Sequence, residues 1–188
     1  IVGKKIILLP GRLTTWKGQE IFLEALNKVN IKLGNDSFIG VILGNDQGRD
    51  LYKKKLIRLV EQYRLTKQIR FIDHCKNMPL AYKISDIVIS ASIEPEAFGR
   101  VSVEAQSMQK MIIASNLGGS NETVINGKTG ILFEAGNSDE LCEKIIKVMN
   151  MDPNEISKIG DNGRENAVKK FNVEKMCFST YSEYKKLF

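Results

Sequence analysis

The chain has 188 residues, 43% of them hydrophobic and 27% charged, which is ordinary for one globular domain and too short for two full α/β domains. No apolar run approaches the roughly 20 residues that a membrane-spanning helix requires. The formal charge of +6 favours anionic partners, namely nucleic acid, phosphorylated small molecules or an anionic membrane face, without choosing among them.

Short apolar runs alternate with segments of helical periodicity along most of the chain. The runs that predict strands are residues 6–9, 38–43, 69–72, 87–90, 111–114 and 130–133. The segments that predict helices are residues 16–33, 52–63, 78–85, 100–109, 141–149, 154–171 and 173–188. Continuously apolar strands that alternate with helices are typical of a parallel sheet covered on both faces. We therefore expect an α/β, Rossmann-like domain over residues 1–170, with a sheet of about six strands, and a separate C-terminal helix over residues 171–188.

The loop after the first predicted strand combines a glycine turn with two cations. Residues 11–18 read GRLTTWKG and precede a predicted helix. In such sheets ligands bind beyond the carboxyl ends of the strands, where glycine lets backbone N–H groups approach an anion and arginine bridges phosphate oxygens. The loop is not a Walker loop, and no G-x-G-x-x-G is present. We interpret Arg12 and Lys17 as candidate phosphate ligands, the alternative being two ordinary surface charges.

Two carboxylates lie around the start of the helix predicted at residues 100–109. Glu96 falls in the preceding loop and Glu104 inside the helix, on a turn that can still face the same crevice. Ionised carboxylates are acceptors that take hydrogen bonds from adjacent sugar hydroxyls in pairs. The alternative is a pair of solvated acids that the helix dipole favours. Beside the cationic loop, the pair indicates a ligand that carries both phosphate and sugar.

Cysteine and histidine are too sparse to predict a disulfide framework or a zinc site. Cys75, Cys142 and Cys177 are widely spaced, and His74 is the single histidine, so we favour a reducing, cytoplasmic environment. We interpret His74 as an ordinary loop residue. The chain opens without the pattern of a secretory signal, and we expect a domain cut from a longer protein.

The joint order of these motifs resembles the carboxyl-terminal domain of family 4 glycosyltransferases, which have the GT-B fold and are of the "glycosyl transferases group 1" type. The residues that carry the resemblance are G-R-L and K-G within residues 11–18, the spaced pair Glu96 and Glu104, A-S and G-G within residues 114–119, Glu122, and N-G-x-x-G at residues 126–130. The resemblance spans nearly the whole chain.

The resemblance implies that the ligand is a nucleotide diphosphate sugar. Arg12 and Lys17 would hold the diphosphate beside Gly11, Glu96 would meet the hydroxyls of the donor sugar, and Glu104 would accept the ribose hydroxyls. The implied catalytic residues are Arg12, Lys17 and Glu96. The loop at Gly44 and the end of the third predicted strand, Ile72 to His74, would border the base, and further donor contacts are implied at Phe98, Gly99, Arg100 and Val101.

The nucleobase end of the implied site departs from the family pattern. Asp73 stands where the family often has a glycine after the third strand. The choice among UDP, GDP and ADP therefore stays open. The chain has no metal-binding Asp-x-Asp motif, so we expect transfer without a metal ion, and we expect no cofactor.

The predicted function is retaining transfer of a glycosyl group from a nucleotide diphosphate sugar to a hydroxyl acceptor, with this chain as the donor-binding half. The expected kind of enzyme is a hexosyltransferase of polysaccharide or lipopolysaccharide biosynthesis. Three alternatives stay open: half of a sugar-nucleotide epimerase, a non-catalytic module that binds nucleotide sugars, and a nucleic-acid-binding protein, which the lack of aromatic stacking residues disfavours.

The expected partner of the chain is an amino-terminal GT-B domain, without which we expect no transfer. An apolar stripe of Cys177, Tyr181, Tyr184 and Phe188 on the last predicted helix is expected to face that domain. Peripheral contact with an anionic inner membrane face is compatible with the basic surface.

Overall fold

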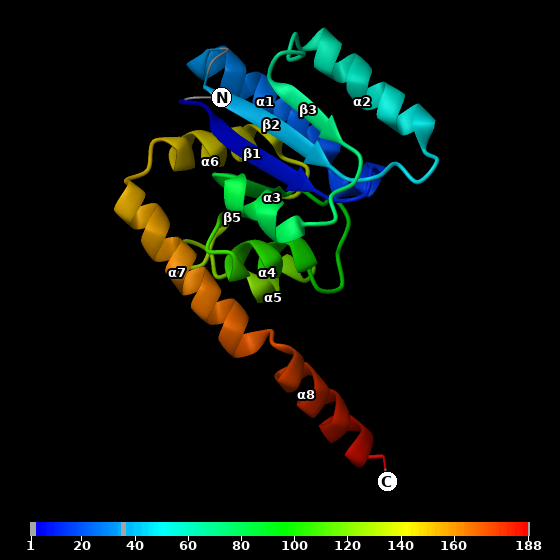
Figure 1. Cartoon of the computed structure of the whole chain (residues 1–188), viewed down its shortest axis with the longest axis vertical. Coiled ribbons are helices and arrows are strands. Elements are labelled where there is room, and N and C mark those ends of the chain that lie inside the picture. Colours follow the sequence, from blue (N-terminus) through cyan, green and yellow to red (C-terminus); the bar gives the residue numbers. More distant parts are fainter. Residues whose placement is uncertain (1–2, 35–36, 188) are drawn as a thin grey trace.

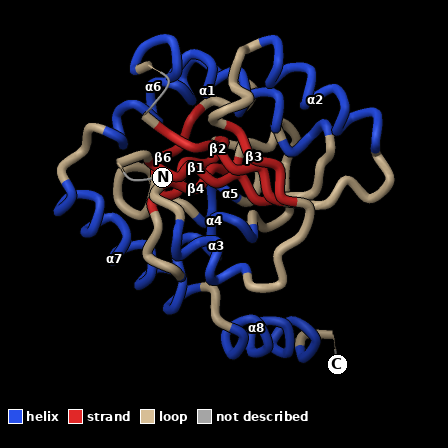
Figure 2. Tube along the Cα trace, turned by 45° about the horizontal axis from the view of Figure 1, so that its top comes forward, coloured by secondary structure: helices blue, strands red, loops and turns tan. Residues whose placement is uncertain are grey.

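A computed structural model describes residues 3–34 and 37–187 of the chain. Within these residues a parallel sheet has the strand order β3-β2-β1-β4-β5-β6, and helices cover both of its faces (Figure 1, Figure 2). The strands are β1 Lys5–Pro10, β2 Phe38–Leu43, β3 Ile69–Ile72, β4 Ile87–Ser90, β5 Met111–Ser115 and β6 Ile131–Phe133. The predicted Rossmann-like sheet of about six strands is confirmed.

The helices divide between the two faces of the sheet. They are η1 Thr15–Lys17, α1 Gln19–Leu33, α2 Asp50–Gln62, α3 Met78–Ile84, α4 Arg100–Ser107, α5 Ser120–Thr123, α6 Ser138–Met149, α7 Pro153–Lys170 and α8 Val173–Lys185. Figure 2 shows α1, α2 and α6 on one face and α3, α4 and α5 on the other, and α7 lies against α4.

The sheet separates two hydrophobic cores because successive side chains of a strand point to opposite faces. In β1, Ile7 and Leu9 belong to a first core cluster that includes Phe22 of α1. Leu8, between them, belongs to a second cluster that includes Tyr82 of α3. This two-sided burial explains why the strands are continuously apolar in sequence.

The strand order places the turning point of the topology between β1 and β4. Both strands are central, and they pair in parallel, with Ile7 opposite Ile87 and Leu8 opposite Val88. Connections run away from this point on both sides, so the loops after β1 and β4 diverge and leave a crevice at the carboxyl ends of the strands.

Three local expectations differ from the structure. The helix predicted at residues 16–33 is divided into η1 and α1, because Gly18 between them adopts a left-handed conformation with φ 72°. The four-residue helix α5 was not predicted, because it is too short to show a periodic pattern. The last strand begins at Ile131 instead of residue 130.

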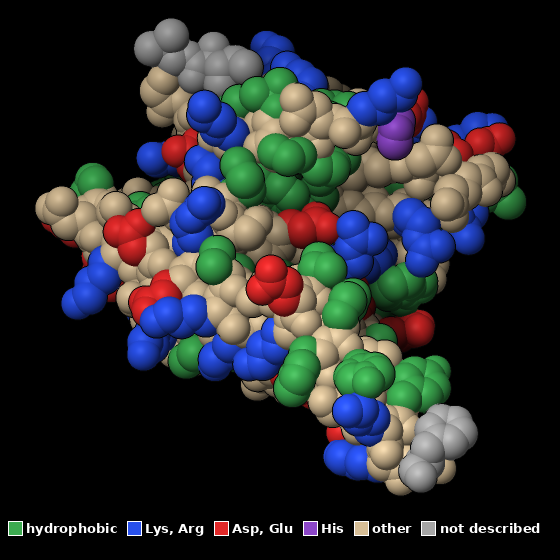
Figure 3. Space-filling view, turned by 60° about the horizontal axis from the view of Figure 1, so that its bottom comes forward, with side chains coloured by type: hydrophobic (Ala, Val, Ile, Leu, Met, Phe, Trp, Pro, Cys, Tyr) green, Lys and Arg blue, Asp and Glu red, His purple; other side chains and the backbone are tan. Residues whose placement is uncertain are grey.

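Helix α8 extends away from the sheet beyond α7 (Figure 1). It has no buried residue, and Figure 3 shows hydrophobic and basic side chains side by side over it. The stripe predicted on this helix is exposed at Cys177, Tyr181 and Tyr184, while Phe188 lies outside the described residues. No helix of residues 3–34 and 37–187 is long and apolar enough to cross a membrane.

Candidate functional site

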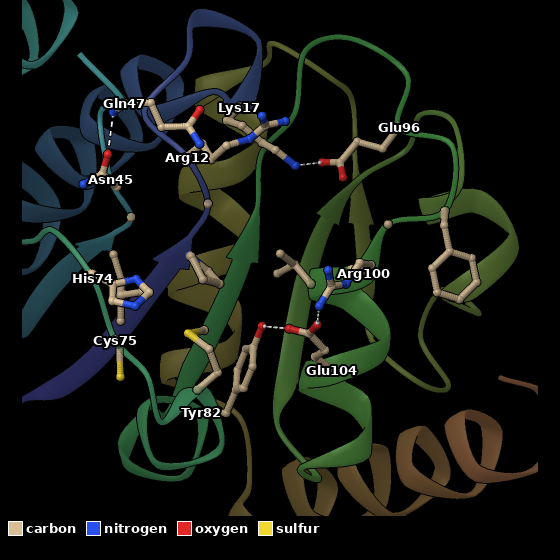
Figure 4. A pocket seen from close by; sticks show the side chains of 18 of the residues that line it. Arg12, Lys17, Asn45, Gln47, His74, Cys75, Tyr82, Glu96, Arg100 and Glu104 are labelled. Carbon is tan, nitrogen blue, oxygen red and sulfur yellow. Dashed lines mark hydrogen bonds and ion pairs between the residues drawn. The ribbon is translucent and has the colours of Figure 1, made fainter. Parts of the chain in front are cut away.

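A pocket of about 720 Å³ opens at the carboxyl ends of the central strands (Figure 4). Its walls come from the loops after β1, β2, β3 and β4 and from the start of α4. The predicted site residues that line it are Gly11, Arg12, Lys17, Gly44, Glu96, Phe98, Gly99, Arg100, Val101 and Glu104. The two cations and two acids singled out in the sequence therefore lie around one cavity.

Close backbone contact between the loops after β1 and β2 forms one wall of the pocket. The Gly11 N–H donates to the Leu43 carbonyl at 2.8 Å, and the Leu13 N–H donates to the Asn45 carbonyl at 3.1 Å. A Cβ atom at Gly44 would lie 1.9 Å from the Gly11 carbonyl oxygen. Only glycine permits this approach, so Gly44 shapes the wall that faces the ligand.

Ile72 is the predicted site residue that the structure does not bring to the pocket. Its carbonyl accepts the Gly44 N–H at 2.8 Å, and the residue is 43% exposed at the end of β3. His74 and Cys75, two and three residues further along, line the pocket instead. The donor contact implied at Ile72 therefore stays a prediction, whereas His74, at the other end of the implied range, does line the pocket.

The cationic loop and the first carboxylate meet directly. Lys17 Nζ lies 2.7 Å from Glu96 Oε1, with the two side chains only 14% and 15% exposed. The Ser92 hydroxyl donates to the same carboxylate oxygen, and the Gly119 N–H donates to the Glu96 carbonyl at 2.7 Å. Lys17 and Glu96 therefore neutralise each other, and Glu96 is held from two further sides.

The second carboxylate is also fixed by two donors. The Tyr82 hydroxyl donates to Glu104 Oε2 at 2.7 Å, and Arg100 Nη2 donates to Glu104 Oε1 at 2.9 Å (Figure 4). Burial, and then the hydrogen bond to Glu104, raises the pKa of Tyr82. Arg12, by contrast, forms no ion pair within residues 3–34 and 37–187, and its carbonyl accepts a hydrogen bond from the Gln19 side chain at 2.8 Å.

The start of α4 supplies backbone donors to the same cavity. Gly99 caps the helix in a left-handed conformation with φ 76°, and Phe98, Gly99, Arg100 and Val101 line the pocket. The first N–H groups of a helix lack partners within the helix and carry partial positive charge. This end of the pocket is therefore suited to an anion or to the oxygens of a sugar.

Several lining residues were missed by the sequence reasoning. They are Pro10, Leu43, Asn45, Gln47, Cys75, Met78, Tyr82 and Ala97, whereas His74, which the resemblance implied beside the base, does line the pocket. Asn45 and Gln47 could have been found, because polar residues directly after a predicted strand lie at the ligand-binding edge. Tyr82 carried no such signal, because a tyrosine in a short predicted helix is expected to pack in the hydrophobic core.

Asp73 is held at the edge of the site by a lysine. Lys53 Nζ lies 2.5 Å from Asp73 Oδ1 and 3.6 Å from Asp46 Oδ2. The hydrogen bond to Asp73 raises the pKa of Lys53, although burial opposes the shift. The lysine thus ties the loop after β2 to the loop after β3.

No group of three or more His, Cys, Asp and Glu side chains is placed to hold a metal ion within residues 3–34 and 37–187. The positive charges that face the pocket come from Arg12, Lys17 and Arg100.

Known proteins are similar to this chain in sequence and in architecture. Residues 1–166 match the family profile described as "Glycosyl transferases group 1". The capsular polysaccharide biosynthesis glycosyltransferase CapM of Staphylococcus aureus is 42% identical over 79 residues, which cover 42% of this chain and 20% of that protein.

Two solved structures superpose closely on the chain. A glycosyltransferase from Rickettsia africae has a TM-score of 0.92 and 33% identity, over 99% of this chain and 48% of that one. HepE of Anabaena, in complex with UDP-glucose, has a TM-score of 0.90 and 27% identity, over 97% of this chain and 49% of that one. The chain thus spans about half the length of these two structures.

Proposed function

The chain belongs to the glycosyl transferases group 1 family, and on that premise we propose that it is the donor-binding half of a retaining GT-B glycosyltransferase whose donor is a UDP-sugar. The observation that carries the proposal is the convergence of Arg12, Lys17, Glu96 and Glu104 on one pocket. The UDP-glucose complex of HepE, 27% identical to this chain, supports uracil as the base.

The proposed roles follow from the charges around the pocket. Arg12 and Lys17 bind the diphosphate, Glu96 accepts hydrogen bonds from the donor sugar, and Glu104 accepts them from the ribose. Backbone N–H groups at the start of α4, beside Gly99, contribute to the sugar and diphosphate contacts.

The chemical task of these residues is to stabilise the departing UDP. The bond between the anomeric carbon of the sugar and the bridging oxygen breaks, and negative charge grows on the diphosphate. Preorganised cations in a cavity stabilise that charge more in the transition state than in the ground state. Because Arg12 and Lys17 supply this positive charge, we propose transfer without a metal ion or cofactor.

Turnover of the full-length protein tests this assignment. Each charge-assisted hydrogen bond contributes about 1.5–3 kcal/mol, so Arg12→Ala and Lys17→Ala should each lower kcat at least about tenfold. Unchanged kinetics in both variants would refute the role of the two cations.

The remainder of the full-length protein is the proposed partner of this half. The chain covers about half of its solved relatives, and the exposed apolar side chains of α8 offer a surface for that remainder to cover. We propose that it binds the acceptor hydroxyl, that the sugar is a hexose, and that the product serves polysaccharide assembly in the cytoplasm, at the inner membrane face. Proton NMR of the product would test retention, because an inverted anomeric configuration contradicts it.

Calorimetric titration of the chain tests donor binding directly. UDP-glucose, GDP-mannose and ADP-glucose would be titrated in parallel, and we expect UDP-glucose to bind best. Tighter binding of the GDP- or ADP-sugar would overturn the choice of base, and binding of none of the three would overturn the donor site itself. A salt-sensitive gel shift with nucleic acid, without nucleotide-sugar binding, would point to a different class of protein.

A further inference from the structure

Tyr82 is a core tyrosine whose hydroxyl reaches the pocket. Only 2% of the residue is exposed, and its ring belongs to the second core cluster, together with Val88 of β4 and Ala105 of α4. The hydroxyl donates to Glu104 Oε2 at 2.7 Å (Figure 4). The sheet and α4 thus hold the ring, and the ring holds the hydroxyl against the carboxylate.

The two donors to Glu104 differ in how firmly they are placed. Arg100 Nη2 lies 2.9 Å from Glu104 Oε1, but the Arg100 side chain is 83% exposed and the Glu104 side chain 35%. Solvent screens such a surface pair, so it holds the carboxylate only weakly. The hydroxyl of Tyr82 is carried by a buried ring, so it is the donor that sets the orientation of Glu104.

The hydroxyl is a permanent donor. Burial raises the pKa of Tyr82, and the hydrogen bond to Glu104 raises it further. A tyrosine with a raised pKa stays protonated over the physiological range. The contact therefore does not depend on pH where the protein works.

A carboxylate held in this way still has acceptor capacity for a ligand. Its two oxygens offer about four lone-pair positions, and Tyr82 and Arg100 occupy one on each oxygen. One position on each oxygen remains, which matches two hydroxyls on adjacent carbons. Ribose offers such a pair, whereas 2′-deoxyribose offers one hydroxyl.

We propose that Tyr82 is a positioning residue that orients Glu104 toward both ribose hydroxyls and thereby sets a preference for ribonucleotides over 2′-deoxyribonucleotides. The inference rests on the proposed donor site. Fixing the carboxylate in advance removes the cost of ordering it when the ligand binds.

The test is calorimetric titration of the chain with UDP and with 2′-deoxy-UDP. Wild type should bind UDP more tightly. Tyr82→Phe keeps the ring and removes the donor, so it should weaken UDP binding by about fivefold to tenfold and 2′-deoxy-UDP binding by less. The preference for UDP should therefore shrink.

A matched control is Tyr63→Phe. Tyr63 is the C-cap residue that follows α2, and it packs on the first core cluster, across the sheet from Tyr82. It does not line the pocket. This variant should keep the wild-type affinity for both nucleotides. In a Glu104→Gln background, Tyr82→Phe should change the preference no further, because the hydroxyl acts through the carboxylate.

The outcomes separate this inference from the proposed function. If wild type binds UDP but Tyr82→Phe weakens UDP and 2′-deoxy-UDP equally, or keeps the full preference, Tyr82 does not position Glu104 and the donor site stands. A Tyr82→Phe variant that unfolds where wild type is folded would assign the hydroxyl to stability and overturn the inference as well. Failure of wild type to bind UDP would overturn both proposals.

Discussion

Glu96→Gln should make the chain bind UDP more tightly, although Glu96 is a proposed ligand-binding residue. Lys17 is paired with Glu96 at 2.7 Å, so a diphosphate must compete with the carboxylate for the lysine. Glutamine removes this competition and also removes a negative charge from the cavity. UDP lacks the sugar that Glu96 is proposed to bind, so the substitution removes no contact with UDP.

The magnitude follows from the environment of the ion pair. At 2.7 Å the gross Coulomb energy is about 6 kcal/mol for an effective dielectric constant of about 20. Desolvation offsets most of it, and measured ion pairs with partial exposure are worth up to about 1 kcal/mol net. Releasing Lys17 should therefore tighten UDP binding by up to about fivefold.

Calorimetry with UDP and UDP-glucose on wild type and Glu96→Gln provides the assay. The variant should gain affinity for UDP and lose the extra affinity that the glucose moiety provides. Glu94→Gln is the control, because Glu94 is an exposed acid in the same loop that does not line the pocket, and its loss should leave both affinities near wild type. Weaker UDP binding by Glu96→Gln would refute the competition between carboxylate and diphosphate.

Three further changes test the walls of the site and the edge of the sheet. Gly44→Ala would place a Cβ atom 1.9 Å from the Gly11 carbonyl oxygen. It should therefore lower the free energy of unfolding by about 1–3 kcal/mol and abolish UDP binding. Wild-type stability in urea melts and wild-type affinity in titration would contradict this. Asn137→Ala removes the side chain that caps α6 and should cost about 1 kcal/mol in the same melts, whereas Asn137→Ser should restore most of it. The Glu134 N–H, and then Lys144, lowers the pKa of Glu140 below its usual value near 4.5. The stability that Glu140 contributes is therefore present above that value and is lost as the pH falls through the lower folded-state pKa. Glu140→Gln should lower the free energy of unfolding by up to about 1 kcal/mol at neutral pH, and by progressively less in acid.

Much of the fold could be predicted because its signals are local. Three strands, β2, β3 and β4, have the bounds that the apolar runs predict. Strands inside a sheet that is covered on both faces are rich in apolar residues, which makes them visible in the sequence. The short helix α5 and the division at Gly18 were not predictable in this way. A four-residue helix has no period, and the left-handed glycine sits inside a continuous helical pattern.

The candidate site was predicted at the level of single residues. Arg12, Lys17, Glu96 and Glu104 stood out because charged residues near glycines, after buried strands, lie at the ligand-binding edge of a parallel sheet. The sequence could not show that Lys17 and Glu96 pair with each other, because their contact depends on β1 lying beside β4.

The sequence by itself determined the α/β class, the alternation of strands and helices, and the loops that carry charge, because each of these is written in runs of a few neighbouring residues. The tertiary structure alone decided the strand order, the presence of Cys75 and Met78 in the pocket lining, and the contact between Tyr82 and Glu104. The physical reason is that an apolar strand can pair with any other apolar strand, so its sequence pattern does not specify which strand lies beside it. Distant side chains meet only where the packing of both cores fixes which strands and helices are neighbours.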